Sequence, residues 1–193
     1  YPYHASSTSL GSFFPRWSQK GTTEDFIKLL SGKKRERELR DHISKQEEKL
    51  QSWKNVIISS VITDKNRHME GKSVFDAAAE SQKPCFEFIR DLLIEEKNQV
   101  AMVNFSMSED NLKQVLADPN VFIGSDGNAL APYGALGKGK PHPRSYGTFV
   151  RVLGKYAREE KVLTLPAAIR KMTSLPAEQF RLSGRGMVKE GYY

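Results

Sequence analysis

The sequence has little cysteine and no long apolar run. Its 193 residues include one cysteine, Cys85, so an internal disulfide and a cysteine-based zinc site are excluded. No apolar stretch approaches the roughly 18 residues that a membrane-spanning helix needs. These absences predict no membrane partner, and they are compatible with a reducing compartment, so we expect a cytoplasmic protein.

The chain also lacks an initiator methionine and a charged-then-apolar signal region, since it opens with Tyr1-Pro2-Tyr3. At the other end, residues 187–193 have the pattern of a strand that is just beginning. Both ends therefore predict a piece of a longer protein.

Positive charge is in excess, with a formal net charge of +7. The densest basic run, residues 33–40, is interleaved with acids, and mixed charge continues through residues 45–49. Such a mixture is more typical of a solvated helix face than of a phosphate-binding stripe. Because no basic motif with interleaved aromatics is present, we expect no nucleic-acid partner.

Strand-like segments alternate with helical ones along the chain. This order favours an α/β fold with a parallel sheet. Strands are predicted at residues 53–62, 100–107 and 121–127. Helices are predicted at residues 34–50, 73–81, 85–98, 108–116 and 146–160, with others starting at Thr23, Pro166 and Pro176.

The stretch Val121-Phe122-Ile123-Gly124-Ser125-Asp126-Gly127 is the most informative local pattern. Three apolar residues run into a carboxylate and a glycine that permits a turn. Functional side chains gather at the carboxyl ends of strands in α/β folds. Asp126 is therefore a candidate catalytic residue, although an aspartate that caps the following turn has the same pattern.

Two further segments carry polar chemistry. In His142-Pro143-Arg144, the arginine offers a planar fork of donors that suits a carboxylate or a phosphate. His142 is open to three roles, as a ligand, an acid or a loop histidine. The segment at residues 1–9 places two phenols and several hydroxyls together, and each segment alone has the composition of an ordinary surface loop.

Taken together with Arg151-Val152-Leu153-Gly154-Lys155-Tyr156 and residues 166–177, these three motifs closely resemble the N-acyl-D-amino-acid deacylases. These D-aminoacylases belong to the amidohydrolase superfamily. The resemblance covers nearly the whole chain except about residues 33–62.

The resemblance implies the C-terminal part of a metal-dependent (β/α)8 TIM barrel. Residues 1–175 would supply the last two strands, with Tyr1-Pro2-Tyr3 ending the seventh and Asp126 the eighth. Residues from about 13 to 73 would be an insertion over the active site. Residues 176–193 would begin the return to a small β-sandwich.

The implied activity is hydrolysis of the linear amide of small N-acyl-D-amino acids, with zinc as cofactor. Asp126 resembles the aspartate that takes the proton of the attacking water and passes it to the leaving amine, and it is also considered as a metal ligand. Arg144, with Tyr1 and Ser7, stands where the family grips the substrate's α-carboxylate.

The family's main metal ligands would lie upstream of Tyr1. None of the four histidines here matches a ligand position, and one of them, His4, stands where a small hydroxyl residue is more usual. We therefore expect that this chain alone is inactive and does not bind zinc tightly.

Three alternatives stay open at this point. One is a non-catalytic α/β interaction module, and another is a basic nucleic-acid-binding protein. A nearer one is a different amide hydrolysis, such as that of dihydropyrimidinase-like enzymes.

Overall fold

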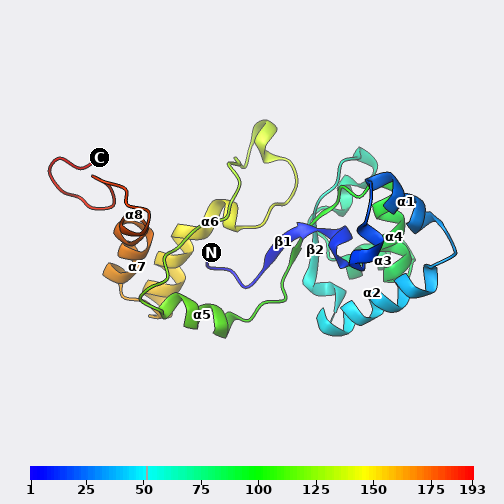
Figure 1. The fold of residues 1–193 in the computed structure, drawn as a ribbon, viewed down its shortest axis with the longest axis horizontal. Helices are drawn as coiled ribbons and strands as arrows, with labels where there is room; N and C mark the ends of the chain where they lie inside the picture. Colours follow the sequence, from blue (N-terminus) through cyan, green and yellow to red (C-terminus); the bar gives the residue numbers. More distant parts are fainter. Residues whose placement is uncertain (51) are drawn as a thin grey trace. The chain divides into compact units, whose positions relative to one another are not determined.

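The computed structural model describes residues 1–50 and 52–193, which divide into two compact units (Figure 1). Unit 1 consists of Tyr1–His4, Met107–Ala131 and Pro143–Tyr193. Unit 2 consists of Ala5–Ser106 and Pro132–His142. Each unit has an apolar core of its own.

Unit 2 contains a three-stranded sheet. The strands β1 (Ser6–Ser9), β3 (Ala101–Asn104) and β2 (Val56–Ser60) lie in that order, with β3 in the centre. Both pairs are antiparallel, and Val103 lies opposite a residue of each edge strand. The α/β class is confirmed, but the predicted parallel sheet is wrong.

The connection from β2 to β3 differs from that of a typical parallel pair. A parallel pair needs a crossover that returns the chain to its starting end, usually through one helix. The connection here contains two helices, α3 (Val74–Glu80) and α4 (Cys85–Glu95), which pack against each other. Across this connection, β3 runs antiparallel to β2.

Local capping chemistry starts the first helix, α1 (Thr23–Ser31). Thr22 accepts a hydrogen bond from the backbone N–H of Asp25, and the Asp25 carboxylate accepts one from the backbone N–H of Thr22. This reciprocal capping box satisfies donors that a helix start leaves open. The predicted helix is confirmed, with its cap one residue earlier than the predicted start at Thr23.

Among the described residues of unit 2, the remaining elements are one further α-helix and five short 3-10 helices. They are α2 (Glu36–Leu50), η1 (Leu10–Phe13), η2 (Arg16–Gln19), η3 (Trp53–Asn55), η4 (Asp64–Met69) and η5 (Gly134–Gly137).

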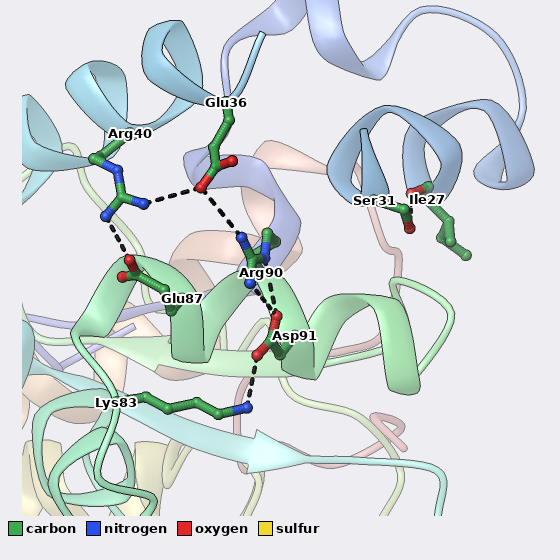
Figure 2. A network of polar contacts seen from close by, with 8 residues as sticks. All are labelled: Ile27, Ser31, Glu36, Arg40, Lys83, Glu87, Arg90 and Asp91. Carbon is green, nitrogen blue, oxygen red and sulfur yellow. Dashed lines mark hydrogen bonds and ion pairs between the residues drawn. The ribbon is translucent and has the colours of Figure 1, made fainter. Parts of the chain in front are cut away.

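A polar network joins α2 to α4 (Figure 2). Arg40 donates to Glu36 at 3.0 Å and to Glu87 at 2.6 Å. Arg90 reaches Glu36 at 3.4 Å and also pairs with Asp91. Partly exposed ion pairs contribute little individually and more as a network. These basic side chains are paired with acids, in keeping with a solvated helix face.

Unit 1 is helical in its described residues. Its helices are α5 (Glu109–Ala117), α6 (Arg144–Arg151), the π-helix η6 (Val152–Glu159), α7 (Leu165–Met172) and α8 (Ser174–Gln179). Its core consists of Leu116, Ile123, Val152, Tyr156, Leu163 and Ala168. In neither unit do the described residues contain a helix with the length and apolar character of a membrane span.

The strand predicted at residues 121–127 is not formed. The backbone N–H of Ile123 instead donates to the carbonyl of Lys171 at 2.9 Å. The buried ammonium of Lys171 in turn donates to the carbonyls of Asp118 and Val121. A strand needs a neighbour for its ladder, and here the end of α7 takes those backbone groups instead.

The strand predicted to begin near residue 187 is also absent from the described C-terminal segment. The backbone N–H of Tyr193 donates to the carbonyl of Gly184 at 2.9 Å, and that of Tyr192 to Lys189 at 3.1 Å. These bonds join residues within the C-terminal segment, and none of them belongs to a sheet.

Candidate active site

Asp126 lies on a turn with left-handed backbone geometry, at φ +48°. Aspartate is one of the few residues other than glycine that adopt this region readily. The turn is capped by its neighbour, since the backbone N–H of Gly127 donates to Ser125 Oγ at 3.3 Å. The carboxylate of Asp126 is therefore available for another partner, and its side chain is 68% exposed.

That partner is Arg144, the first residue of α6. Its Nη1 lies 2.8 Å from Asp126 Oδ2, and its side chain is only 14% exposed. The guanidinium carbon also lies 4.5 Å from the centre of the Tyr1 ring. An arginine held against an aromatic face and a carboxylate keeps its fork of donors in one orientation.

Two glycines permit these close approaches. A Cβ on Gly127 would lie 2.9 Å from Ser145 Cα and 3.2 Å from the Arg144 carbonyl. A Cβ on Gly147 would lie 2.5 Å from the Tyr3 hydroxyl. The turn that carries Asp126 and the segment that carries Tyr1 therefore both lie directly on the first residues of α6.

The other two candidates belong to unit 2. Ser7 lies on β1, opposite Val103 of the central strand. His142 is buried, and its Nε2 lies 3.0 Å from the carbonyl of Ala5. Of the four predicted site residues, the structure thus brings three together in unit 1, Asp126, Arg144 and Tyr1, and places Ser7 in the other unit.

A second polar cluster was missed by sequence reasoning. Glu109, at the start of α5, accepts hydrogen bonds from Lys155 at 2.5 Å, Tyr156 at 2.8 Å and His4 at 2.9 Å. The segment around Glu109 had been expected only to open a helix. The partners come from segments about 46 and 105 residues away, so no local pattern could have indicated them.

The cluster predicts a dependence of stability on pH. Burial alone would raise the pKa of Glu109, but the bonds from Lys155, Tyr156 and His4 outweigh it and lower the pKa from 4.5 to about 2. A depressed folded-state pKa stabilises the fold above about 4.5 and loses that contribution as the pH falls toward about 2.

Denaturant unfolding of the complete protein between pH 5 and pH 2, with and without Glu109→Gln, checks this. We expect the wild type to lose stability more steeply than the variant across this window. Glu178→Gln serves as the control, because Glu178 is an exposed acid that pairs with Arg170. This variant should lose stability with the same slope as the wild type. Equal slopes for wild type and Glu109→Gln would contradict the assignment.

The described residues do not form a metal site on their own. In residues 1–50 and 52–193, no three His, Cys, Asp or Glu side chains are grouped so that they could hold an ion. Asp126, the carboxylate considered as a ligand, faces the positive charge of Arg144, which disfavours a cation at that oxygen. The donor set present therefore does not fit zinc.

No family model matches the sequence. A D-aminoacylase of Alcaligenes xylosoxydans xylosoxydans is 36% identical over 125 residues, which are 65% of this chain and 23% of that protein. An N-acyl-D-glutamate deacylase of the same organism is 43% identical over 89 residues, 46% of this chain and 17% of that protein.

Solved structures of such deacylases show the same similarity. The N-acyl-D-glutamate deacylase of Bordetella bronchiseptica, crystallised with zinc and a phosphonate inhibitor, matches all of this chain with a TM-score of 0.66 and 26% identity. This chain is similar in sequence and fold to part of the N-acyl-D-amino-acid deacylases. A D-aminoacylase described as defining a novel subset of amidohydrolases matches with a TM-score of 0.62 and 29% identity.

The expected family resemblance is thus confirmed, and it concerns part of these proteins. The chain spans about a quarter or less of the length of the curated deacylases, and 30% of the solved structures. The solved D-aminoacylases include one described as having a binuclear metal centre.

Proposed function

We propose that the complete protein containing this chain hydrolyses the linear amide bond of N-acyl-D-amino acids. The observation that carries the proposal is the grouping of Asp126, Arg144 and Tyr1 at the start of α6 in a chain related to such deacylases. One carboxylate and one oriented guanidinium are the groups that hydrolysis of an acylated amino acid requires from this part of the protein.

In the proposed reaction, Asp126 moves one proton. Its carboxylate takes a proton from the attacking water as the water oxygen bonds to the acyl carbon. It then gives that proton to the amide nitrogen as the carbon–nitrogen bond breaks. The products are a carboxylate and a D-amino acid.

Arg144 would hold the substrate's α-carboxylate, with the Tyr1 ring keeping the guanidinium in place. In this structure Asp126 occupies one donor of that guanidinium at 2.8 Å. A substrate carboxylate would compete for the same donor and would leave Asp126 facing the water. Ser7, which belongs to unit 2, stays a predicted substrate-binding residue.

We propose that zinc is held by residues outside this chain, because the described residues do not fit it. Bound zinc would polarise the acyl carbonyl and activate a water. For the chain alone we expect neither hydrolysis nor tight zinc binding. A calorimetric zinc titration of the purified chain checks this, and stoichiometric sub-micromolar binding would contradict it.

The barrel assignment is part of the same proposal. Tyr1-Pro2-Tyr3 and Asp126 would end the last two strands of a (β/α)8 barrel, with an insertion at about residues 13–73. Neither segment has a strand partner within the described residues, so the earlier strands would have to supply one. The return of residues 176–193 to a β-sandwich stays a prediction of the resemblance, and the cytoplasmic location stays a prediction from the sequence composition.

The activity is tested by incubating the complete, zinc-supplemented protein with N-acetyl-D-amino acids and their L-enantiomers and measuring the released amino acid. We expect release from the D-substrates and little from the L-substrates. Release from neither enantiomer, across acidic and apolar side chains, would contradict the proposal. Hydrolysis of cyclic amides alone would favour the dihydropyrimidinase-like alternative.

A further inference from the structure

The segment Tyr1–His4 contains one member of the candidate site, Tyr1. Two side chains, one from α6 and one from the π-helix that follows it, contact the backbone of this segment. Arg151, the last residue of α6, donates from Nε to the Pro2 carbonyl at 2.8 Å. The hydroxyl of Tyr156 lies 3.4 Å from the same carbonyl. Tyr156 is fully buried in the core of unit 1, so this attachment point is rigid.

The guanidinium of Arg151 also organises the neighbouring ring. Its carbon lies 4.8 Å from the centre of the Tyr3 ring and 5.6 Å from that of Tyr156. The Tyr3 hydroxyl donates to the Pro143 carbonyl at 3.4 Å and leaves no room for a side chain at Gly147. Tyr3 is thereby packed against the turn of α6 that begins with Arg144.

The backbone around Tyr156 is unusual. Residues Val152–Glu159 form a π-helix, a rare geometry that is found frequently at functional sites. Within it, Lys155 and Tyr156 both donate to Glu109, which also binds His4. Each end of the Tyr1–His4 segment therefore has a partner that is anchored through α6 or its π-helical continuation.

We infer that Arg151 is a positioning residue for the proposed carboxylate grip. By holding the Pro2 carbonyl and the Tyr3 ring, it places the Tyr1 ring against the guanidinium of Arg144. It acts through Tyr1 and Arg144 and does not itself touch the substrate. The expected effect on catalysis rests on the proposed function, whereas the placement of Tyr1 by Arg151 does not.

The activity test compares two substrates in the complete protein. Arg151→Lys keeps the charge but loses the planar fork that both donates to Pro2 and lies against Tyr3. We expect kcat/KM for an N-acetyl-D-amino acid to fall about 10- to 100-fold, mainly through KM, since small misplacements cost rates of this order. The α-carboxamide of the same substrate, which lacks the carboxylate, should be hydrolysed as well as by the wild type.

Arg158→Lys is the matched control, because Arg158 lies in the π-helix that directly follows Arg151 and its side chain is 79% exposed. It should change neither substrate's kinetics. If Arg151→Lys lowers kcat/KM equally for the acid and the carboxamide, or for neither, the inference is overturned. A wild type inactive on all N-acetyl-D-amino acids would count against the proposed function instead.

A spectroscopic test of placement does not depend on activity. In arginine-labelled complete protein, the Arg144 side-chain resonances should be shifted upfield by the Tyr1 ring, and Arg144→Lys identifies them. We expect this shift to be lost in Arg151→Lys and kept in Arg158→Lys. An Arg144 signal that is unchanged in Arg151→Lys would overturn the inference.

Discussion

Replacing Asp126 by Asn in the complete protein is expected to lower kcat for N-acetyl-D-amino acids by about 10²- to 10⁴-fold, the range that a positioned acid–base group contributes. An amide has nearly the same shape as the carboxylate but cannot take a proton from water. The side chain is 68% exposed and lies on a turn that Ser125 caps, so the fold should be unaffected.

The same substitution should leave binding of a carboxylate ligand intact or tighten it. In the wild type, Asp126 occupies a donor of Arg144 at 2.8 Å, and Asn removes that competing negative charge. The measurement is steady-state kinetics together with the dissociation constant of a non-hydrolysed D-amino-acid analogue. Loss of turnover with unchanged or tighter binding separates proton transfer from binding.

Glu159→Gln is the control, because this acid lies in unit 1 and is 65% exposed in its pair with Arg158. It should change neither kcat nor ligand affinity. If Asp126→Asn retained wild-type turnover, Asp126 would have only the role of a partner to Arg144. The alternative of a structural aspartate would then be the better one.

Local chemistry made the helices predictable. Ser73 and Ser108 accept hydrogen bonds from the backbone three residues ahead, as their positions in the sequence indicated. Pro166 lies in the first turn of α7, where its missing N–H is not needed. Each of these signals depends on residues within one turn of the chain.

Sheet geometry was not predictable in the same way. Residues 121–127 have the composition of a buried strand, yet Ile123 donates to Lys171, 48 residues later, and no ladder forms. β3 runs antiparallel to β2, with two helices between the strands, although the sequence predicted a parallel sheet. The composition shows that a segment is apolar, but its backbone pairing depends on which distant backbone groups lie beside it in the fold.

The site residues also differ in whether the sequence could indicate their roles. Asp126, Arg144 and Tyr1 were candidates because their motifs resemble a known family. Arg151 belongs to a motif that carried the resemblance but was expected only to continue a helix. Its role depends on a carbonyl 149 residues away, and only a structure can place the two together.

Replacing Arg144 by Met is expected to have the second large effect. Truncating one partner of a close, desolvated charge pair costs about 2–5 kcal/mol, so we expect kcat/KM for N-acyl-D-amino acids to fall by about 30- to 5,000-fold. Arg144→Lys should recover only part of this, because an ammonium lacks the planar fork that binds both carboxylate oxygens. Steady-state kinetics on the D-acid and its α-carboxamide measure the effect.

The comparison with the carboxamide is decisive, because a substrate without the charged carboxylate makes no ion pair with Arg144 that the substitution could remove. The variant should therefore hydrolyse the carboxamide as the wild type does, and its preference for D- over L-substrates should shrink as the anchoring carboxylate is released. Arg170→Met, which removes an equally long cation that is 50% exposed and paired with Glu178, should change neither ratio. Equal losses on acid and carboxamide would mean that Arg144 supports the start of α6, beside Gly127 and Tyr1, and that the substrate's carboxylate is held elsewhere.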